Sequence, residues 1–88
     1  MPLYSVVLTK SAEKDLRKLP AKTTKKIIEV LRSFEQQPRP DGCKKLKGYA
    51  NLWRYRIGDY RIIYAISDVI LLVDVREIGH RKDIYDKL

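Results

Sequence analysis

Residues 53–61 read WRYRIGDYR, and this stretch decides how the chain folds. Side chains of a strand alternate between its two faces, so the aromatic and aliphatic residues share one face while Arg54 and Arg56 share the other. Residues 58–59 are Gly-Asp, a two-residue turn sequence that tolerates positive φ. The stretch therefore predicts a β-hairpin in which Arg56 lies directly opposite Arg61.

That juxtaposition of Arg56 and Arg61 indicates a function. Like charges that face each other across a sheet destabilise it. A chain that keeps them, with Arg54 two residues away, is expected to use them to hold an anion. Phosphate is the first candidate, because a guanidinium group binds it in bidentate geometry. The alternative is a solvated, positively charged strand face, and the hairpin alone does not choose between the two.

The composition supports the first interpretation. The chain has 88 residues, enough for a single domain over residues 1–88, and 44% of them are hydrophobic. Its 19 Lys and Arg against 11 Asp and Glu give a formal net charge of +8. Such an excess in a short chain predicts an acidic partner, which can be a nucleic acid, an anionic membrane or an acidic protein.

Several classes of protein are disfavoured by the sequence. The longest apolar run, residues 69–73, is too short to span a membrane, and the N-terminus lacks a signal-peptide pattern. The single cysteine, Cys43, cannot form a disulfide within the chain, and one histidine beside it predicts no zinc cluster. We therefore expect a soluble cytoplasmic protein without a metal or cofactor.

The first half of the chain predicts a strand and two helices. Residues 3–9 alternate and are rich in β-branched side chains, which is typical of a strand. Ser11 is the expected N-cap of a short helix, Pro20 interrupts, and a second helix runs over residues 21–36. The two helices carry apolar stripes, formed by Ala12, Leu16 and Leu19 in the first and by Ile27, Ile28, Leu31 and Phe34 in the second.

The second half predicts a meander of three antiparallel strands from Leu52 onward, after a turn at residues 38–42 and a lysine-rich loop. Ser67-Asp68 reads as a second short turn. The same register then puts Val69 and Leu71 on the side of the sheet that packs on the helices. Three aromatic side chains are expected in the core on that side: Trp53, Tyr55 and Tyr64. It also places Asp74 opposite Arg61.

The fold class that follows is α+β. It consists of an N-terminal strand, two helices, a three-stranded antiparallel meander forming one sheet, and a short helix or turn at residues 82–88.

Three segments in this order resemble the RelE branch of the RelE/ParE toxin superfamily: KLKG at residues 45–48, WRYRIGDYRIIY at 53–64 and IGHRKDIY at 78–85. The resemblance covers essentially the whole chain. It implies a RelE-like fold and a toxin of a type II toxin–antitoxin system that cleaves messenger RNA in the ribosomal A site. It also implies a cognate antitoxin that neutralises the toxin.

The functional residues of that family are basic side chains on the sheet together with an arginine and a tyrosine near the C-terminus. By resemblance these are Arg54, Arg56, Arg61, Arg81 and Tyr85. The best-studied RelE pattern has lysines in place of Arg54 and Arg56. Because arginine stays protonated, we expect these two to stabilise phosphate charge rather than to act as a general base.

Three further residues are candidates for the site. His80 is a possible proton shuttle, because histidine side chains exchange protons near neutral pH, although a histidine after a strand is more often a surface or packing residue. Lys45 and Lys47 are candidate contacts to RNA, with a solvated loop as the equal alternative.

Three alternatives stay open. A ParE-like toxin that poisons DNA gyrase shares the fold, and Arg81 with Tyr85 favours ribonuclease activity over it. A non-catalytic basic module that binds RNA or an acidic protein belongs to a different class, and an inactive toxin that still binds its antitoxin is a third possibility.

Overall fold

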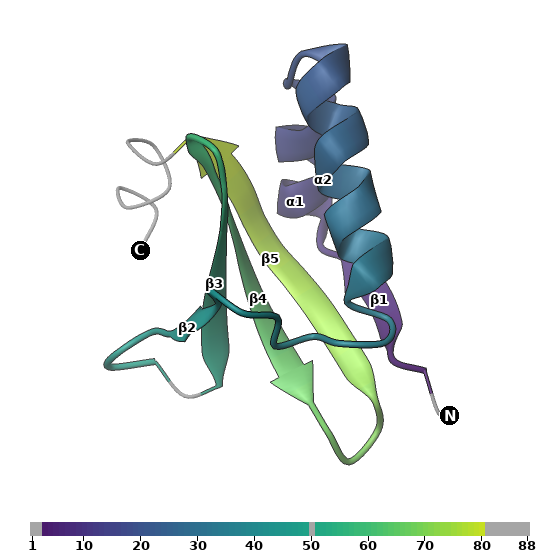
Figure 1. Ribbon diagram of the computed structural model, residues 1–88, viewed down its shortest axis with the longest axis vertical. Helices are drawn as coiled ribbons and strands as arrows, with labels where there is room; N and C mark the ends of the chain where they lie inside the picture. The colour runs from purple at the N-terminus through teal and green to yellow at the C-terminus, as the bar shows by residue number, and fades with distance from the viewer. Residues whose placement is uncertain (1–2, 50, 81–88) are drawn as a thin grey trace.

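The computed structural model describes residues 3–49 and 51–80 and contains two helices and five strands (Figure 1). In chain order they are β1 (Ser5–Leu8), α1 (Lys10–Arg17), α2 (Ala21–Ser33), β2 (Lys44–Lys45), β3 (Leu52–Ile57), β4 (Tyr60–Ser67) and β5 (Leu72–His80). The predicted α+β class is confirmed. The expected C-terminal helix lies outside the described residues.

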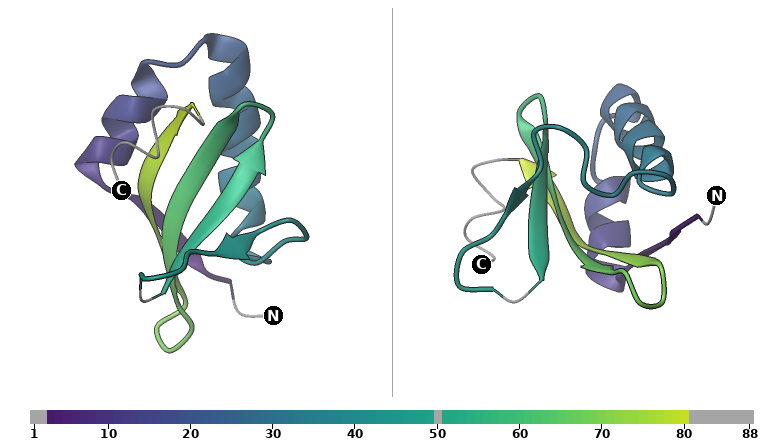
Figure 2. Two further views of the ribbon diagram at one scale, coloured as in Figure 1. Left: turned by 90° about the vertical axis from the view of Figure 1, so that its left-hand side faces the viewer. Right: turned by 60° about the horizontal axis from the view of Figure 1, so that its bottom comes forward.

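The five strands form one sheet in the order β1-β5-β4-β3-β2 (Figure 2). The predicted meander is β3, β4 and β5, which pair in antiparallel fashion, while β1 pairs in parallel with β5. β2 was not predicted. It is two residues long and pairs with β3 at the far edge of the sheet.

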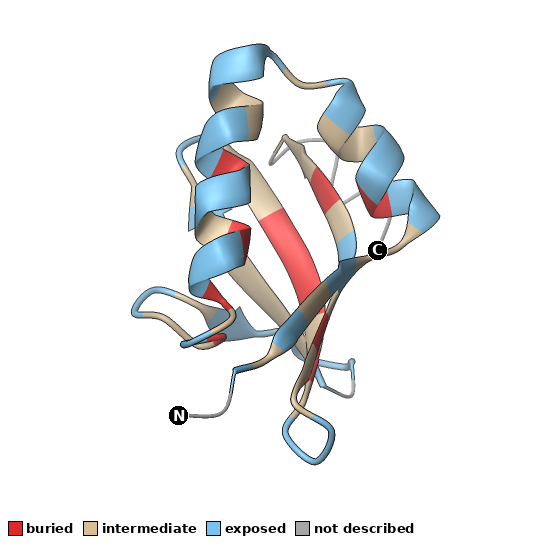
Figure 3. Ribbon diagram, turned by 90° about the vertical axis from the view of Figure 1, so that its right-hand side faces the viewer, coloured by how far each residue is buried: buried red, intermediate tan, exposed pale blue. Residues whose placement is uncertain are grey.

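Both helices lie on one side of the sheet and bury their apolar stripes against it (Figure 1, Figure 3). The core cluster consists of Ala12, Ile27, Leu31, Phe34, Ile62, Tyr64, Ile66, Val73, Val75 and Ile78. The predicted stripes are confirmed except at Ile28, which is 37% exposed. The three predicted core aromatics also lie on this side, Tyr64 fully buried and the other two packed at the margin. No helix in the described part of the chain is long and apolar enough to cross a bilayer.

The start of α1 differs from the prediction. Thr9, rather than Ser11, is the N-cap, because its Oγ1 accepts a hydrogen bond from the Ala12 N–H at 3.1 Å. The same hydroxyl donates to the carbonyl of Arg76 in β5 at 3.0 Å. The Ser11 hydroxyl instead donates to the Glu77 carboxylate, at 3.2 Å from Oε2. Both side chains therefore join α1 to β5.

The β4–β5 connection is longer than the predicted two-residue turn. Residues 68–71 form it, and β5 begins only at Leu72. Val69 is 94% exposed and Leu71 has a positive φ of 52°, so neither belongs to the helix-facing side as predicted.

A β-bulge interrupts the pairing of β4 with β5. The register shifts between Ile63 and Tyr64, and Arg76 is the extra residue on β5. A bulge reverses the in–out alternation of the residues that follow it. As a result Ile78 faces the helices. The longer β4–β5 connection shifts the pairing by four residues and the bulge by one more, so Gly79 rather than Asp74 lies opposite Arg61. The predicted pairing of Asp74 with Arg61 was therefore wrong.

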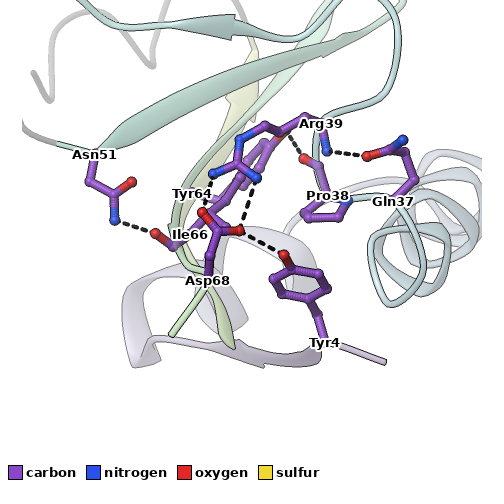
Figure 4. A network of polar contacts seen from close by, with 8 residues as sticks. All are labelled: Tyr4, Gln37, Pro38, Arg39, Asn51, Tyr64, Ile66 and Asp68. Carbon is purple, nitrogen blue, oxygen red and sulfur yellow. Dashed lines mark hydrogen bonds and ion pairs between the residues drawn. The ribbon is translucent and has the colours of Figure 1, made fainter. Parts of the chain in front are cut away.

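A polar cluster joins three segments at the end of the sheet where β4 connects to β5 (Figure 4). Arg39, after α2, donates to both oxygens of Asp68 at 3.0 and 2.9 Å, and the Tyr4 hydroxyl donates to Asp68 at 2.6 Å. Arg39 also lies 4.9 Å from the centre of the Trp53 ring. The bonds to Arg39 and Tyr4 lower the pKa of Asp68, and the bond to Asp68 raises the pKa of Tyr4. We call these residues the Asp68 clamp.

Candidate nucleic-acid interface

The side of the sheet that faces away from the helices carries three of the arginines that the sequence singled out, Arg54, Arg56 and Arg61. Tyr55 packs on the helix side, where its ring meets Phe34 edge-on with centroids 6.0 Å apart. Because neighbours along a strand point to opposite faces, Arg54 and Arg56 lie on the other side. The predicted alternation of β3 is confirmed.

The hairpin brings Arg61 to the same place. Gly58 has a φ of 57°, as the predicted turn requires, and Arg56 pairs directly with Arg61. Residues opposite one another in an antiparallel pair have Cβ atoms about 4.5–5.5 Å apart. Nε of Arg56 donates to the Gly58 carbonyl at 3.0 Å, which holds that guanidinium beside the turn. The predicted register is confirmed.

These three arginines surround an apolar residue. Ile63 is fully buried, pairs with Arg54 and lies two residues after Arg61 on the same face. Arg54 and Arg61 are half-buried, whereas Arg56 is exposed. Partial burial lowers the local dielectric and strengthens the attraction of these guanidinium groups for an anion. We call the surface formed by Arg54, Arg56, Arg61 and Ile63 the arginine face.

Two carboxylates of β5 lie on the same side of the sheet as the arginines. Glu77 pairs with Ile63, and its carboxylate accepts from the Ser11 hydroxyl at 3.2 Å. Asp74 pairs with Ala65, further along the sheet, and its Oδ2 accepts from Arg76 at 3.2 Å. Gly79, which lies opposite Arg61, contributes no side chain. No carboxylate of β5 therefore lies directly opposite Arg61.

The structure does not bring His80 to the arginines. It pairs with Tyr60, and the two rings meet edge-on with centroids 5.7 Å apart. Tyr60 packs against the core, so His80 shares the helix-facing side. Arg81 and Tyr85 lie outside the described residues.

Tyr64 is not a candidate for proton transfer. Burial raises its pKa, and its hydroxyl donates to the Pro38 carbonyl at 2.8 Å. Tyr64 therefore stays neutral as part of the core. Within residues 3–49 and 51–80, no three His, Cys, Asp or Glu side chains gather so as to hold a metal ion.

The lysines at the sheet edge are distributed differently from the prediction. Lys45 pairs with Trp53 and therefore points to the side away from the arginines. Lys47 is exposed in the following turn, and both line a shallow pocket of about 430 Å³. Lys44, which sequence reasoning left out, pairs with Arg54 and lies on the arginine face. No signal in the sequence distinguishes Lys44 from Lys45, because a two-residue strand shows no alternation.

Comparison with known proteins adds family context. Residues 6–85 match the family described as ParE toxin of type II toxin–antitoxin system, parDE. Toxin RelE3 of Methanocaldococcus jannaschii is 35% identical over 86 residues, which cover 92% of this chain and 94% of that protein. Toxin RelG of Mycobacterium tuberculosis is 31% identical over 83 residues, which cover 93% and 95%.

Solved structures show the same fold. The toxin–antitoxin complex RelBE2 of Mycobacterium tuberculosis matches with a TM-score of 0.81 at 30% identity, covering 90% of this chain and 99% of that one. The archaeal RelE–RelB complex of Pyrococcus horikoshii also has a TM-score of 0.81, at 28% identity, covering 94% and 99%. The likeness extends over nearly the whole chain in both cases.

Proposed function

This chain belongs to the ParE toxin family of type II toxin–antitoxin systems and is a RelE-like toxin, and from this premise we propose that it is a ribosome-dependent mRNA endoribonuclease that inhibits translation. The observation that carries the proposal is the arginine face, where Arg56 lies opposite Arg61 and Arg54 lies beside them. A purely structural sheet gains nothing from this repulsion. A site for a phosphodiester gains a preformed set of cationic donors.

The reaction uses the nucleophile that RNA carries. The 2′-oxygen loses its proton to a base and attacks the adjacent phosphorus, forming a new P–O bond. The bond from phosphorus to the 5′-oxygen breaks, and that oxygen takes up a proton. The products are a 2′,3′-cyclic phosphate and a 5′-hydroxyl. Negative charge grows on the non-bridging oxygens, and we assign Arg56 and Arg61 to stabilise it, with Arg54 positioning the strand.

The proton transfers need other groups, because arginine does not readily lose its proton. The family resemblance assigns Arg81 to the leaving oxygen and Tyr85 to the 2′-hydroxyl, as a base or as an orienting group. The position of His80 on the helix-facing side, in contact with Tyr60, argues against a proton shuttle on the arginine face. These assignments predict that Arg81→Ala and Tyr85→Phe slow the chemical step.

We further propose that a small cognate antitoxin neutralises this chain. The related RelE proteins of Mycobacterium tuberculosis and Pyrococcus horikoshii were solved as complexes with their RelB partners. A net charge of +8 favours an acidic segment that covers the arginine face and excludes RNA from it. We also propose a cytoplasmic location, because the proposed target is the translating ribosome.

The decisive experiment is cleavage of a programmed messenger by the purified protein, with and without ribosomes. We expect cuts only on ribosomes, with cyclic-phosphate ends. Arg61→Ala should lower the rate of cleavage by about 10²-fold or more, since one preformed electrostatic donor contributes that much. Arg32→Ala is the matched control, because it removes an exposed arginine from α2, on the other side of the sheet.

The result also separates the rival functions. Intact messenger in every reaction, together with inhibited DNA supercoiling by gyrase, would establish the ParE-like activity that the family description allows. Intact messenger with tight RNA binding that Arg61→Ala weakens would establish a non-catalytic module. Equal loss of cleavage in Arg61→Ala and Arg32→Ala would contradict the role of the arginine face.

A further inference from the structure

Lys44 extends the arginine face onto a third strand. It pairs with Arg54 across β2 and β3, and residues directly opposite one another in an antiparallel ladder project from the same face. Lys44 is exposed. No carboxylate in the described ranges, 3–49 and 51–80, forms an ion pair with it. Four cations therefore lie on three adjacent strands, with Arg61 on β4, Arg54 and Arg56 on β3, and Lys44 on β2.

We propose that Lys44 is a positioning residue that binds an RNA phosphate flanking the scissile one, an inference that rests on the proposed ribonuclease function. Lys44, Arg54 and Ile63 lie opposite one another on three strands, and Arg61 is two residues from Ile63. Neighbouring strands lie about 4.7–4.9 Å apart and a strand rises about 3.3 Å per residue, so the backbones at Lys44 and Arg61 are separated by roughly 12 Å. At that separation Lys44 lies beside a neighbouring phosphate and not beside the one assigned to Arg56 and Arg61. The four cations instead form a track that follows an RNA strand across the sheet.

The position of Lys45 shows why only one of the two β2 lysines serves this role. Lys45 is equally exposed and adjacent in sequence, but it pairs with Trp53 on the other side of the sheet. The guanidinium of Arg39 already covers the Trp53 ring there. The two lysines therefore differ in the face they occupy and in little else, which makes Lys45 a matched internal control.

A contact to a non-reacting phosphate has a distinct kinetic signature. It stabilises the bound substrate and the transition state equally, so its loss raises KM and leaves kcat unchanged. Formation of such a contact also releases counterions that were condensed on the RNA. Each phosphate neutralised on single-stranded nucleic acid contributes about 0.7 to the slope of log Kobs against log salt concentration.

The test measures binding of a single-stranded RNA octamer, 2′-O-methylated throughout so that it cannot be cleaved, by fluorescence anisotropy. Salt is varied from about 50 to 200 mM. Lys44→Ala should reduce the salt slope by about 0.7, Lys44→Arg should restore it, and Lys45→Ala should leave it unchanged. On programmed ribosomes, Lys44→Ala should raise KM several-fold at constant kcat.

Three results would overturn the inference. Equal effects of Lys44→Ala and Lys45→Ala would show a general charge effect. A lower kcat at unchanged KM would place Lys44 in the chemical step. Absence of octamer binding by the unmodified chain at low salt would show that this face makes no independent contact with RNA. The proposed function fails separately, if the messenger stays intact on ribosomes while the octamer still responds to Lys44→Ala.

Discussion

Arg56 and Arg61 illustrate at the scale of single residues how a candidate functional site can lower the stability of its own scaffold. The two guanidinium groups lie across from one another on β3 and β4, and like charges in this position cost about 0.2–1 kcal/mol relative to a neutral pair. Neither residue belongs to the core cluster. Packing in the core therefore does not account for these two charges, whereas the proposed binding of phosphate does.

Arg56→Gln should consequently stabilise the fold while it impairs the proposed activity. We expect the free energy of unfolding to rise by about 0.2–1 kcal/mol at low salt, because the cross-strand repulsion disappears. The gain should shrink as salt screens the charges. Urea denaturation at two salt concentrations measures both effects. Arg32→Gln on α2 controls for loss of an exposed arginine, and lower stability of Arg56→Gln at low salt would contradict the argument.

The same residues show what the sequence can predict at this scale. The Gly-Asp turn fixes the hairpin register, and the alternation of β3 separates Tyr55 from its arginine neighbours, so the placement of Arg56 opposite Arg61 was predictable. The placement of Lys44 was not. Its strand is only two residues long, and its register is set by pairing with β3, which no local pattern encodes.

At the scale of elements, α1 completes the edge of β5 where β1 no longer reaches. β1 pairs with β5 only as far as Val75. Beyond that point side chains of α1 and its cap take over, and Oδ2 of Asp15 accepts the Ile78 N–H at 3.2 Å. A helix side chain thus replaces the next strand and limits the exposed sheet edge.

Asp15→Ala should therefore destabilise the end of β5. The Ile78 N–H would lose its acceptor, and a polar group left without a partner in a partly buried place costs about 1–3 kcal/mol. Asp15→Asn keeps an acceptor oxygen and should cost less. Urea denaturation and hydrogen exchange at the Ile78 amide measure the two effects. Glu13→Ala, on an exposed position of α1, is the control, and equal costs for all three variants would refute the capping role.

The β5 strand also marks the limit of prediction at this scale. Its existence and its apolar residues Val73 and Val75 were predicted from their alternation. Its first residue and its bulge were not, because the exposed Val69 has the same β propensity as a buried valine. The later start of β5 and its one extra residue together displaced the pairing by five residues, which is why the predicted partner of Arg61 was wrong.

At the scale of the whole molecule, the Asp68 clamp ties together segments that are far apart in the sequence. Tyr4 precedes β1, Arg39 follows α2, and Asp68 begins the turn between β4 and β5 (Figure 4). The cluster lies at the β4–β5 connection, whereas Arg56 and Arg61 lie beside the β3–β4 turn at the other end of the sheet. We therefore expect it to contribute to stability and not to the proposed RNA binding.

The clamp predicts a specific dependence of stability on pH. The bonds from Arg39 lower the pKa of Asp68 in the folded state. The contribution of Asp68 to the free energy of unfolding is therefore complete above its unfolded-state pKa of about 3.9. It is lost as pH falls through the lower pKa of the folded state. The bond to Asp68 raises the pKa of Tyr4, so that contribution is complete below about 10 and is lost as pH rises through the higher folded value.

The stability difference between the unmodified chain and Asp68→Asn should therefore be constant between about pH 4 and pH 10 and decline outside that window. Urea denaturation over a pH series measures it, with Asp41→Asn on an exposed turn as the control for removal of a carboxylate. If the stability difference persists undiminished at about pH 2, the Asp68→Asn variant lacks some interaction other than those of the ionised carboxylate. In that case packing of the turn, and not the charge of Asp68, would hold the three segments together.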